Sequence, residues 1–192
     1  MKKLLLAFIF NILFIGQVMA ESEKKQNLEN TVYIELKDGR VVIEMIPELA
    51  PKHVERIKEL VRQEFYDGVV FHRVIDGFMA QTGDPTGTGT GGSGQNIEAE
   101  FSQFPHIRSM VSMARAMDPN SADSQFFIVL EDSNHLDGQY TIWGKVIEGM
   151  EFVDNIKKGD SNRNGTVSNP DKIITMRIAA DVSENQPKAA SK

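Results

Sequence analysis

The sequence contains no cysteine, and this absence excludes several kinds of chemistry. Among the 192 residues there is no thiol to form a disulfide, to act as a nucleophile, to ligate a metal ion or to carry a lipid. The domain must therefore be stabilised by packing alone. Hydrophobic residues make up 41% of the chain and charged residues 25%, which is typical of a globular domain rather than of a disordered or fibrous protein.

Basic residues are scarce relative to acidic ones. The chain has 21 Lys and Arg residues against 27 Asp and Glu residues, which gives a net charge of −6 with histidine neutral. Proteins that bind the phosphate backbone of nucleic acids usually carry an excess of positive charge. The composition therefore argues against nucleic acid as a partner.

The apolar run at the N-terminus is too short for an ordinary membrane span. Residues 4–15 are apolar except for Asn11, whereas a spanning helix needs about 18 or more consecutive apolar residues. Lys2 and Lys3 precede the run, and the small residue Ala20 follows it. This pattern predicts an export signal that is cleaved after Ala20, with a retained membrane anchor as the alternative.

Cleavage would leave a more acidic protein. The signal holds two of the 21 basic residues and none of the acidic ones, so its removal takes the net charge from −6 to −8. We expect an exported protein, located in a bacterial periplasm or secreted where there is no outer membrane, with no membrane association after cleavage. The predicted organisation is a signal peptide (1–20), a polar linker (21–30), one domain (31–180) and a flexible C-terminal tail (181–192).

Short segments rich in β-forming residues dominate the predicted domain. Val32, Ile34 and Leu36 alternate with more polar neighbours, and the turn dipeptide Asp38-Gly39 predicts a hairpin. The further strands are expected at residues 41–46, 69–75, 110–113, 125–130, 140–147 and 173–178. Many short strands favour an antiparallel barrel, because closure removes unpaired sheet edges.

Two segments have helical periodicity instead. The first begins at Pro51 and repeats apolar residues at Val54, Ile57 and Leu60. The second places Met150, Val153 and Ile156 on one face. We expect these two helices to cover the open ends of the barrel.

One segment combines an arginine with apolar side chains. If residues 69–75 form a strand, a turn at Gly77 returns the chain, so that Phe78 and Gln81 approach Arg73. A charged donor would then border an apolar pocket. The alternative interpretation is an ordinary strand with core aromatics and a solvated arginine.

Two further motifs follow, and together with residues 71–84 they resemble the cyclophilins. These are SMARA at residues 112–116 with SQFFI at 124–128, and LDG at 136–138 with WGKV at 143–146. They occur in the order of that family, and the resemblance extends over about residues 31–179. It implies a closed eight-stranded antiparallel β-barrel capped by two α-helices, and peptidyl-prolyl cis-trans isomerase activity on Xaa-Pro segments of other proteins.

The resemblance also assigns site residues. Arg73 corresponds to the catalytic arginine of the family, and Gln81 to its polar neighbour. The substrate-binding positions are His72, Phe78, Met79, Ala114, Arg115, Ala116, Gln125, Phe127, His135, Leu136 and Tyr140. The activity implied needs no metal and no cofactor. The expected partners are proline-containing segments of unfolded or folding exported proteins, bound by a monomer.

Two positions depart from the best-known eukaryotic members. His135 stands where those members carry tryptophan, and Tyr140 where many carry histidine. Neither change removes the arginine, so the departures affect the expected ligand preference rather than the expected catalysis. Binding of the inhibitor cyclosporin should be weak. A binding module or chaperone that grips proline segments without turnover is the alternative function.

Three other patterns suggest competing functions. Residues 87–92 fit the spacing G-x-G-x-x-G, but they do not join a strand to an apolar helix, so a flexible loop is predicted instead of a dinucleotide site. His53 and His106 lack metal-ligand spacing and are interpreted as surface residues. Residues 160–171 place Asp160 and Asp171 at the ends of a calcium-like spacing, although a polar surface loop is the preferred interpretation.

Overall fold

The structure is a computed structural model of the chain, and it describes residues 27–184. The predicted signal peptide at 1–20, residues 21–26 of the predicted linker and residues 185–192 of the predicted tail lie outside the described part. Within residues 27–184, no helix is long and apolar enough to cross a membrane.

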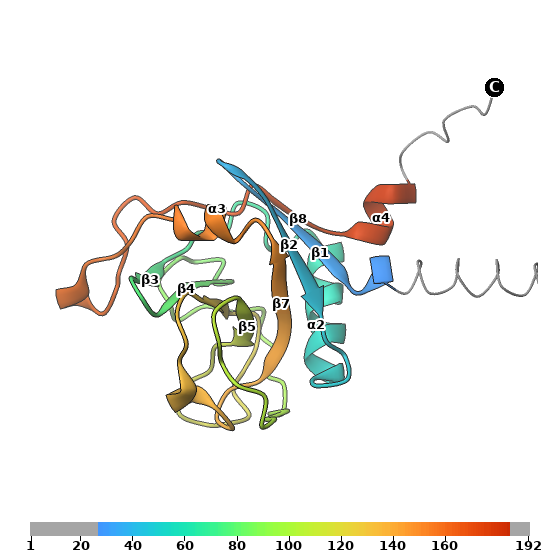
Figure 1. Cartoon of the computed structure of the whole chain (residues 1–192), viewed down its shortest axis with the longest axis horizontal. Helices are drawn as coiled ribbons and strands as arrows, with labels where there is room; N and C mark the ends of the chain where they lie inside the picture. Colours follow the sequence, from blue (N-terminus) through green and yellow to red (C-terminus); the bar gives the residue numbers. More distant parts are fainter. Residues whose placement is uncertain (1–26, 185–192) are drawn as a thin grey trace, which may run out of the picture.

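Eight antiparallel strands form one sheet (Figure 1). They are β1 (Thr31–Leu36), β2 (Gly39–Met45), β3 (Arg73–Ile75), β4 (Met79–Thr82), β5 (Met110–Met113), β6 (Phe126–Val129), β7 (Ile142–Glu148) and β8 (Thr175–Ile178). Their order across the sheet is β3-β4-β6-β5-β7-β2-β1-β8. The prediction of a mainly β fold with eight antiparallel strands is confirmed.

The β1–β2 hairpin shows how the alternating pattern becomes a sheet. Val32, Ile34 and Leu36 are buried, whereas the residues between them are half-exposed. Leu36 pairs with Gly39, so the two-residue turn is formed by the residues between them, and Gly39 is the first residue of β2 rather than a turn residue. The hairpin itself is confirmed.

Helices cover parts of this sheet. Helix α2 (Pro51–Arg62) begins with proline in its first turn, buries its apolar face and packs against β7 and β8. Helix α3 (Met150–Asp154) is a short helix that packs against β2. Both predicted helices are therefore present, although α3 ends before Ile156, which was predicted to share its apolar face. Helix α4 (Ala179–Glu184) packs against β1 and β8 and occupies the start of the segment that we predicted as a flexible tail.

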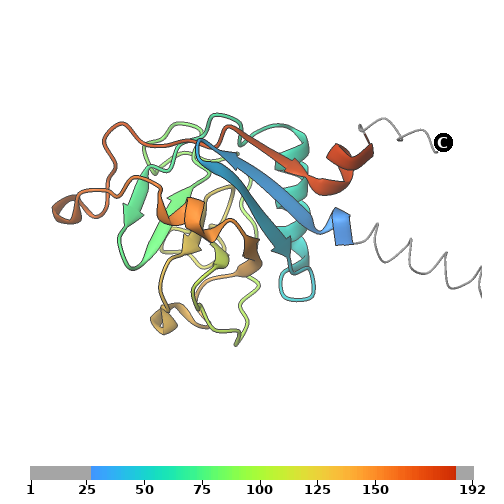
Figure 2. The ribbon, with the colours of Figure 1, turned by 45° about the horizontal axis from the view of Figure 1, so that its top comes forward.

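The sheet is open, and the prediction of a closed barrel is wrong. β3 and β8 lie at its two ends and do not pair with each other. Figure 2 shows that the chain after α3 runs past β3 before it reaches β8. The backbone of this connection bonds to the chain around β3, with Val74 N donating to Gly165 O at 2.8 Å and Phe71 N donating to Asp171 O at 2.9 Å. Irregular chain therefore covers the edge where a closed barrel would have strand pairing.

The buried side chains form two clusters. The larger lies between the sheet and α2, and contains the edge-to-face rings of Phe126 and Trp143, 5.5 Å apart. The smaller cluster consists of Met79, Met110, Phe127, Val129, Leu136 and Ile142. It lies beneath β4, β5 and β6, and it forms part of the wall of the cavity described next.

Candidate active site

The β3–β4 hairpin brings the predicted arginine and glutamine together. Arg73 pairs with Gln81 and Ile75 with Met79, across a turn in which Phe78 N donates to Ile75 O at 3.1 Å. This turn is the one expected at Gly77, whose φ of 66° favours glycine. The predicted approach of Gln81 to Arg73 is confirmed by this register.

Most of the predicted site residues line one cavity of about 310 Å³. Its lining is Arg73, Phe78, Met79, Gln81, Ala114, Arg115, Phe127, His135, Leu136 and Tyr140. The side chains come from β3, the turn after it, β4, β6, the chain after β5, the 3₁₀ helix η1 (Asn134–Leu136) and the chain before β7. Residues up to 67 positions apart in the sequence therefore line the same cavity.

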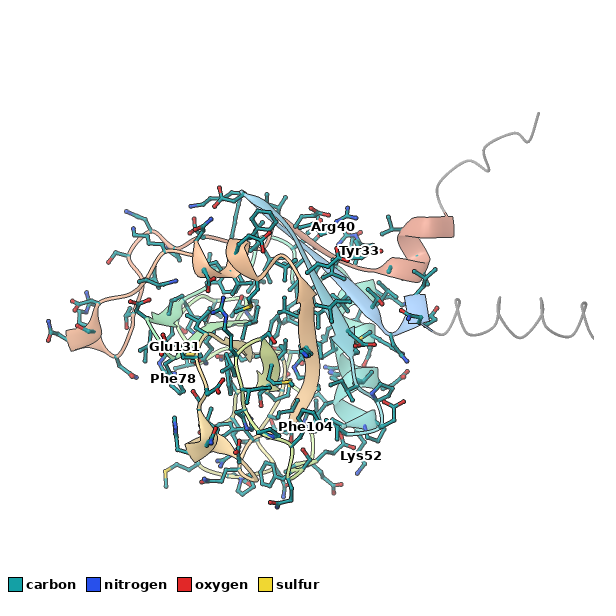
Figure 3. All side chains as sticks on the ribbon, in the orientation of Figure 1. Tyr33, Arg40, Lys52, Phe78, Phe104 and Glu131 are labelled. Carbon is teal, nitrogen blue, oxygen red and sulfur yellow. The ribbon has the colours of Figure 1, made fainter. Side chains whose placement is uncertain are left out.

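Apolar side chains form one wall of this cavity. Met79, Phe127 and Leu136 are almost fully buried and belong to the smaller core cluster. Phe78 and His135 lie at the rim, with their rings 5.4 Å apart, and Figure 3 shows Phe78 close to Glu131 at the edge of the molecule. An apolar wall of this kind suits a small ring with no polar hydrogen to donate.

The guanidinium of Arg73 is held by three hydrogen bonds. Nε donates to Asn164 O at 3.0 Å, Nη2 donates to Asn164 Oδ1 at 3.0 Å, and Nη1 donates to Gln81 Oε1 at 3.1 Å. Nη1 also approaches Met79 Sδ at 3.9 Å. Burial lowers the pKa of Arg73, partly offset by Tyr140. The group stays cationic because an arginine pKa begins far above neutral pH.

A second cavity, of about 430 Å³, adjoins the first. Gln81, Ala114 and Arg115 line both, whereas Ala116 and Gln125 line only the second. Gln81 Nε2 donates to Gln125 Oε1 at 2.9 Å, which links the arginine of the first cavity to the wall of the second. The two cavities form one continuous groove in which an extended chain could lie.

The glycine-rich loop beside this groove is organised by one buried carboxylate. Asp84 accepts hydrogen bonds from the backbone N–H groups of Thr86, Thr88, Gly89 and Gly91. Burial alone would raise the pKa of Asp84, but these bonds outweigh it and hold the pKa well below its usual range. The G-x-G-x-x-G spacing therefore belongs to an ordered loop rather than to a dinucleotide site.

Arg115 is a second cation at the junction of the cavities. Its guanidinium carbon lies 4.7 Å from the centre of the Tyr140 ring and 5.9 Å from that of the exposed Phe101 ring. Its Nε donates to Gln139 O at 3.1 Å. The aromatic contacts hold the long side chain at the junction of the two cavities.

Three histidines do not lie where the sequence suggested. His72 is buried and lines neither cavity, because its ring points under the glycine-rich loop near Gly89. His53 and His106 are fully buried, and the interpretation as surface residues is wrong. Each is held by a carboxylate from a distant segment: Glu100 lies 2.7 Å from His53 Nδ1, and Asp137 lies 2.9 Å from His106 Nδ1.

In the calcium-like loop at residues 160–171, the side-chain oxygens bind groups of the protein itself. Asp160 Oδ1 accepts from Asn162 N, Asn164 faces Arg73, and Asp171 is paired with Lys37 at 2.9 Å. One of these oxygens is bound by a backbone N–H and the other two by cations of the protein, so they do not converge on a metal ion and the calcium hypothesis is not supported. Asn164 is the site residue that sequence reasoning missed. Its signal was the dipeptide Asn-Gly, which marks a left-handed turn.

Comparisons with known proteins agree with this arrangement. Residues 31–178 match the family model described as "Cyclophilin type peptidyl-prolyl cis-trans isomerase/CLD". A protein of Brucella suis named "Probable peptidyl-prolyl cis-trans isomerase" is 52% identical over 189 residues, covering 92% of this chain and 95% of its own. "Peptidyl-prolyl cis-trans isomerase B" of Bacillus subtilis is 46% identical over 133 residues, 68% of this chain and 92% of its own.

Two solved structures are similar in fold. A cyclophilin of Hirschia baltica has a TM-score of 0.72 and 30% identity, covering 84% of this chain and 77% of its own. A cyclophilin-type peptidyl-prolyl cis-trans isomerase of Cryptosporidium parvum, crystallised in the presence of the dipeptide Ala-Pro, has a TM-score of 0.70 and 31% identity, with 77% of this chain and 98% of its own covered.

The buried imidazole of His106 generates a prediction about pH. Burial lowers its pKa from the ordinary 6.5, against the raising effect of the bond to Asp137. As the pH falls below about 6.5, the unfolded chain takes up a proton that the folded protein resists, so stability should decline. The decline can reach about 1.4 kcal/mol per pH unit for one such group.

His106→Asn keeps a donor for Asp137 but cannot titrate. The loss of unfolding free energy between pH 7.5 and pH 5.5, measured by urea denaturation, should be smaller in this variant than in the unchanged protein. His53 and His72 also have pKa values lowered mainly by burial, so part of the decline should remain. Equal declines in both proteins would show that His106 does not contribute.

Proposed function

Because the chain belongs to the cyclophilin-type peptidyl-prolyl cis-trans isomerases, we propose that the apolar wall of its cavity receives the proline ring of a client chain while Arg73 assists rotation of the preceding amide. The observation that carries this proposal is the position of Arg73, a half-buried cation at the edge of a cavity walled by Met79, Phe127 and Leu136. The adjoining groove would hold the client chain on either side of the proline.

Rotation about an Xaa-Pro bond requires only that the protein hold the client chain and one hydrogen-bond donor in place. Rotation of the amide is opposed by about 18–20 kcal/mol of lost resonance, and no bond to hydrogen is broken. No general acid or base is therefore needed. When the amide twists, the lone pair of the prolyl nitrogen becomes localised and can accept a hydrogen bond. A donor on Arg73 would stabilise that twisted state more than either planar one.

Each part of the groove has a proposed share in this step. The apolar wall would hold the ring still, so that the carbonyl group before the proline is the part that turns. Gln81 would keep Arg73 aimed at the cavity. The segment of Ala114, Arg115 and Ala116, with Gln125 beside it, would lie against the client backbone. The presence of Ala-Pro with the relative from Cryptosporidium parvum supports this class of ligand.

A binding module without turnover would need the same cavity but not the cation. Binding of a proline ring depends on the apolar wall, whereas rotation depends on the placed donor. The presence of Arg73 at the edge of the cavity therefore favours catalysis. Replacement of that residue separates the two functions.

Arg73→Ala should lower kcat/KM for a proline peptide by about 10²-fold, because removal of one placed donor from a transition state has an effect of this order. The variant should keep its melting temperature within a few degrees and still bind the peptide. The rate is measured by exchange NMR, which needs no coupled protease.

Arg40→Ala is the matched control for this experiment. Arg40 pairs with Glu35 and lies over the ring of Tyr33, on the hairpin of β1 and β2 (Figure 3). Its replacement should leave the rate unchanged. A folded Arg73→Ala variant with near-native turnover would disprove the proposed role of Arg73.

We further propose that the clients are exported proteins. The support is the N-terminal sequence, in which Lys2 and Lys3 precede the apolar run at 4–15 and Ala20 offers a cleavage site. The enzyme would act in the bacterial periplasm, or outside the cell where there is no outer membrane. In that compartment slow Xaa-Pro isomerisation can limit the folding of secreted chains, and an enzyme without a nucleotide or cofactor can work there.

Expression of the full chain in a Gram-negative host tests the export proposal. The mature protein should appear in the periplasmic fraction, with an intact mass that lacks residues 1–20. Leu6→Arg places a charge in the apolar run and should leave an uncleaved chain in the cytoplasm. A full-length protein found in the cytoplasm without this change would contradict the proposal.

Weak binding of cyclosporin is the last part of the proposal. His135 lies at the rim beside Phe78, where the best-known relatives carry tryptophan. An imidazole offers less apolar area than an indole and places its donor differently. His135→Trp should therefore tighten binding at least several-fold in a calorimetric titration. Unchanged or weaker binding would count against this explanation.

A further inference from the structure

The catalytic role proposed for Arg73 depends on how its long side chain is held. Two of its three guanidinium nitrogens donate to a single residue, Asn164. We propose that Asn164 is a positioning residue, which fixes the guanidinium with two neutral acceptors and leaves its charge available to the twisted amide. This inference rests on the role proposed for Arg73 above.

The contacts define both the plane and the direction of the guanidinium. Nε and Nη2 form one edge of the group, and they meet the backbone oxygen and the amide oxygen of Asn164, each at 3.0 Å. Nη1 meets Gln81 Oε1 at 3.1 Å on the other side. A guanidinium only donates, so the side-chain atom of Asn164 that faces it must be the oxygen. Without these acceptors the flexible side chain would sample many rotamers.

All three acceptors are neutral, which distinguishes Arg73 from most arginines of the protein. Arg40, Arg56, Arg62, Arg108 and Arg177 each form an ion pair with a carboxylate. Arg73 has no such pair among residues 27–184. A carboxylate at the position of Asn164 would bring a negative charge within about 3 Å and cancel much of the field at the prolyl nitrogen. The two neutral oxygens of Asn164 hold the guanidinium without weakening its field at the prolyl nitrogen.

The backbone conformation around Asn164 lets both of its oxygens face Arg73. Asn164 has a left-handed conformation, with φ 53° and ψ 35°, which asparagine tolerates better than most residues. Val74 N donates to Gly165 O at 2.8 Å, and Gly159 N donates to Val74 O at 2.9 Å. The same bonds that cover the open edge of β3 therefore place Asn164 opposite Arg73. In Figures 1 and 2 this orange loop projects beyond β3.

Asn164 does not line either cavity of the groove. Its replacement should leave the walls that receive the proline ring unchanged, and KM with them. The effect should appear in kcat, because only the twisted amide needs a precisely aimed donor. A residue that merely stabilised the loop would not separate the two constants in this way.

Two variants test separately the amide oxygen of Asn164 and its lack of charge. Asn164→Gly keeps the left-handed backbone and the backbone acceptor but removes the amide oxygen. Asn164→Asp keeps the shape and an acceptor but adds a negative charge. Asn169 lies five positions further along the same connection, has a φ of 51°, and makes no hydrogen bond to Arg73 within the described structure. Asn169→Gly and Asn169→Asp are therefore matched controls.

We expect Asn164→Gly to lower kcat by roughly threefold to tenfold and Asn164→Asp by about tenfold or more, with KM within about twofold in both. Both Asn169 variants should keep the native kcat. The Nη2–H resonances of Arg73 in a ¹⁵N NMR spectrum should be protected from solvent exchange in the native enzyme and should broaden in Asn164→Gly, which removes their acceptor, Asn164 Oδ1.

The outcomes distinguish this inference from the proposed function. Loss of activity in Arg73→Ala with full activity in both Asn164 variants would overturn the positioning role alone. Full activity in Arg73→Ala would overturn the role of the arginine itself. Equal losses in the Asn164 and Asn169 variants, or a loss confined to KM, would show a general effect of the loop and would also overturn the inference.

Discussion

The edge of β3 that faces away from β4 is the constraint on which the site depends. This strand has a partner only on the side of β4, and unpaired backbone groups on its other side would invite association with another chain. The connection between α3 and β8 supplies the missing partners through Gly159, Gly165 and Val167. Because Arg73 begins β3, the segment that covers this edge also surrounds the guanidinium. The same segment therefore protects the edge of β3 and positions the arginine.

The apolar wall of the groove has a double use as well. Met79, Phe127 and Leu136 belong to a core cluster that supports β4 and β6, yet they also face the cavity. A wall built from core residues is rigid, so a bound proline ring would meet a surface that is already shaped. Changes in these residues would affect stability and binding together.

Polar side chains in the groove and beside it form a connected series rather than isolated contacts. Asn164, Arg73, Gln81 and Gln125 are joined by successive hydrogen bonds, and Gln125 Nε2 ends the series by donating to Gly91 O at 2.8 Å. The series contains one charge and otherwise neutral groups. Such a network can orient an arginine without neutralising it, which suits a reaction in which no proton moves.

The sequence by itself determined the parts of this protein that depend on neighbouring residues. Alternation at Val32, Ile34 and Leu36 predicted the β1–β2 hairpin, helical spacing after Pro51 predicted α2, and the turn at Gly77 predicted that Gln81 would face Arg73. These interactions span only a few residues, so local preference and the position of apolar groups decide them. The motifs similarly indicated the members of the apolar wall.

Only the tertiary structure decided which distant groups meet. Asn164 lies 91 positions from Arg73, Glu100 lies 47 from His53 and Asp137 lies 31 from His106. A polar residue has the same local sequence whether it faces water or a partner across the molecule. The sequence therefore left a calcium site open beside the preferred surface loop at residues 160–171, and it suggested two surface histidines. The openness of the sheet follows the same logic. Whether β3 and β8 pair depends on the path of the chain between them, and no local pattern encodes that path.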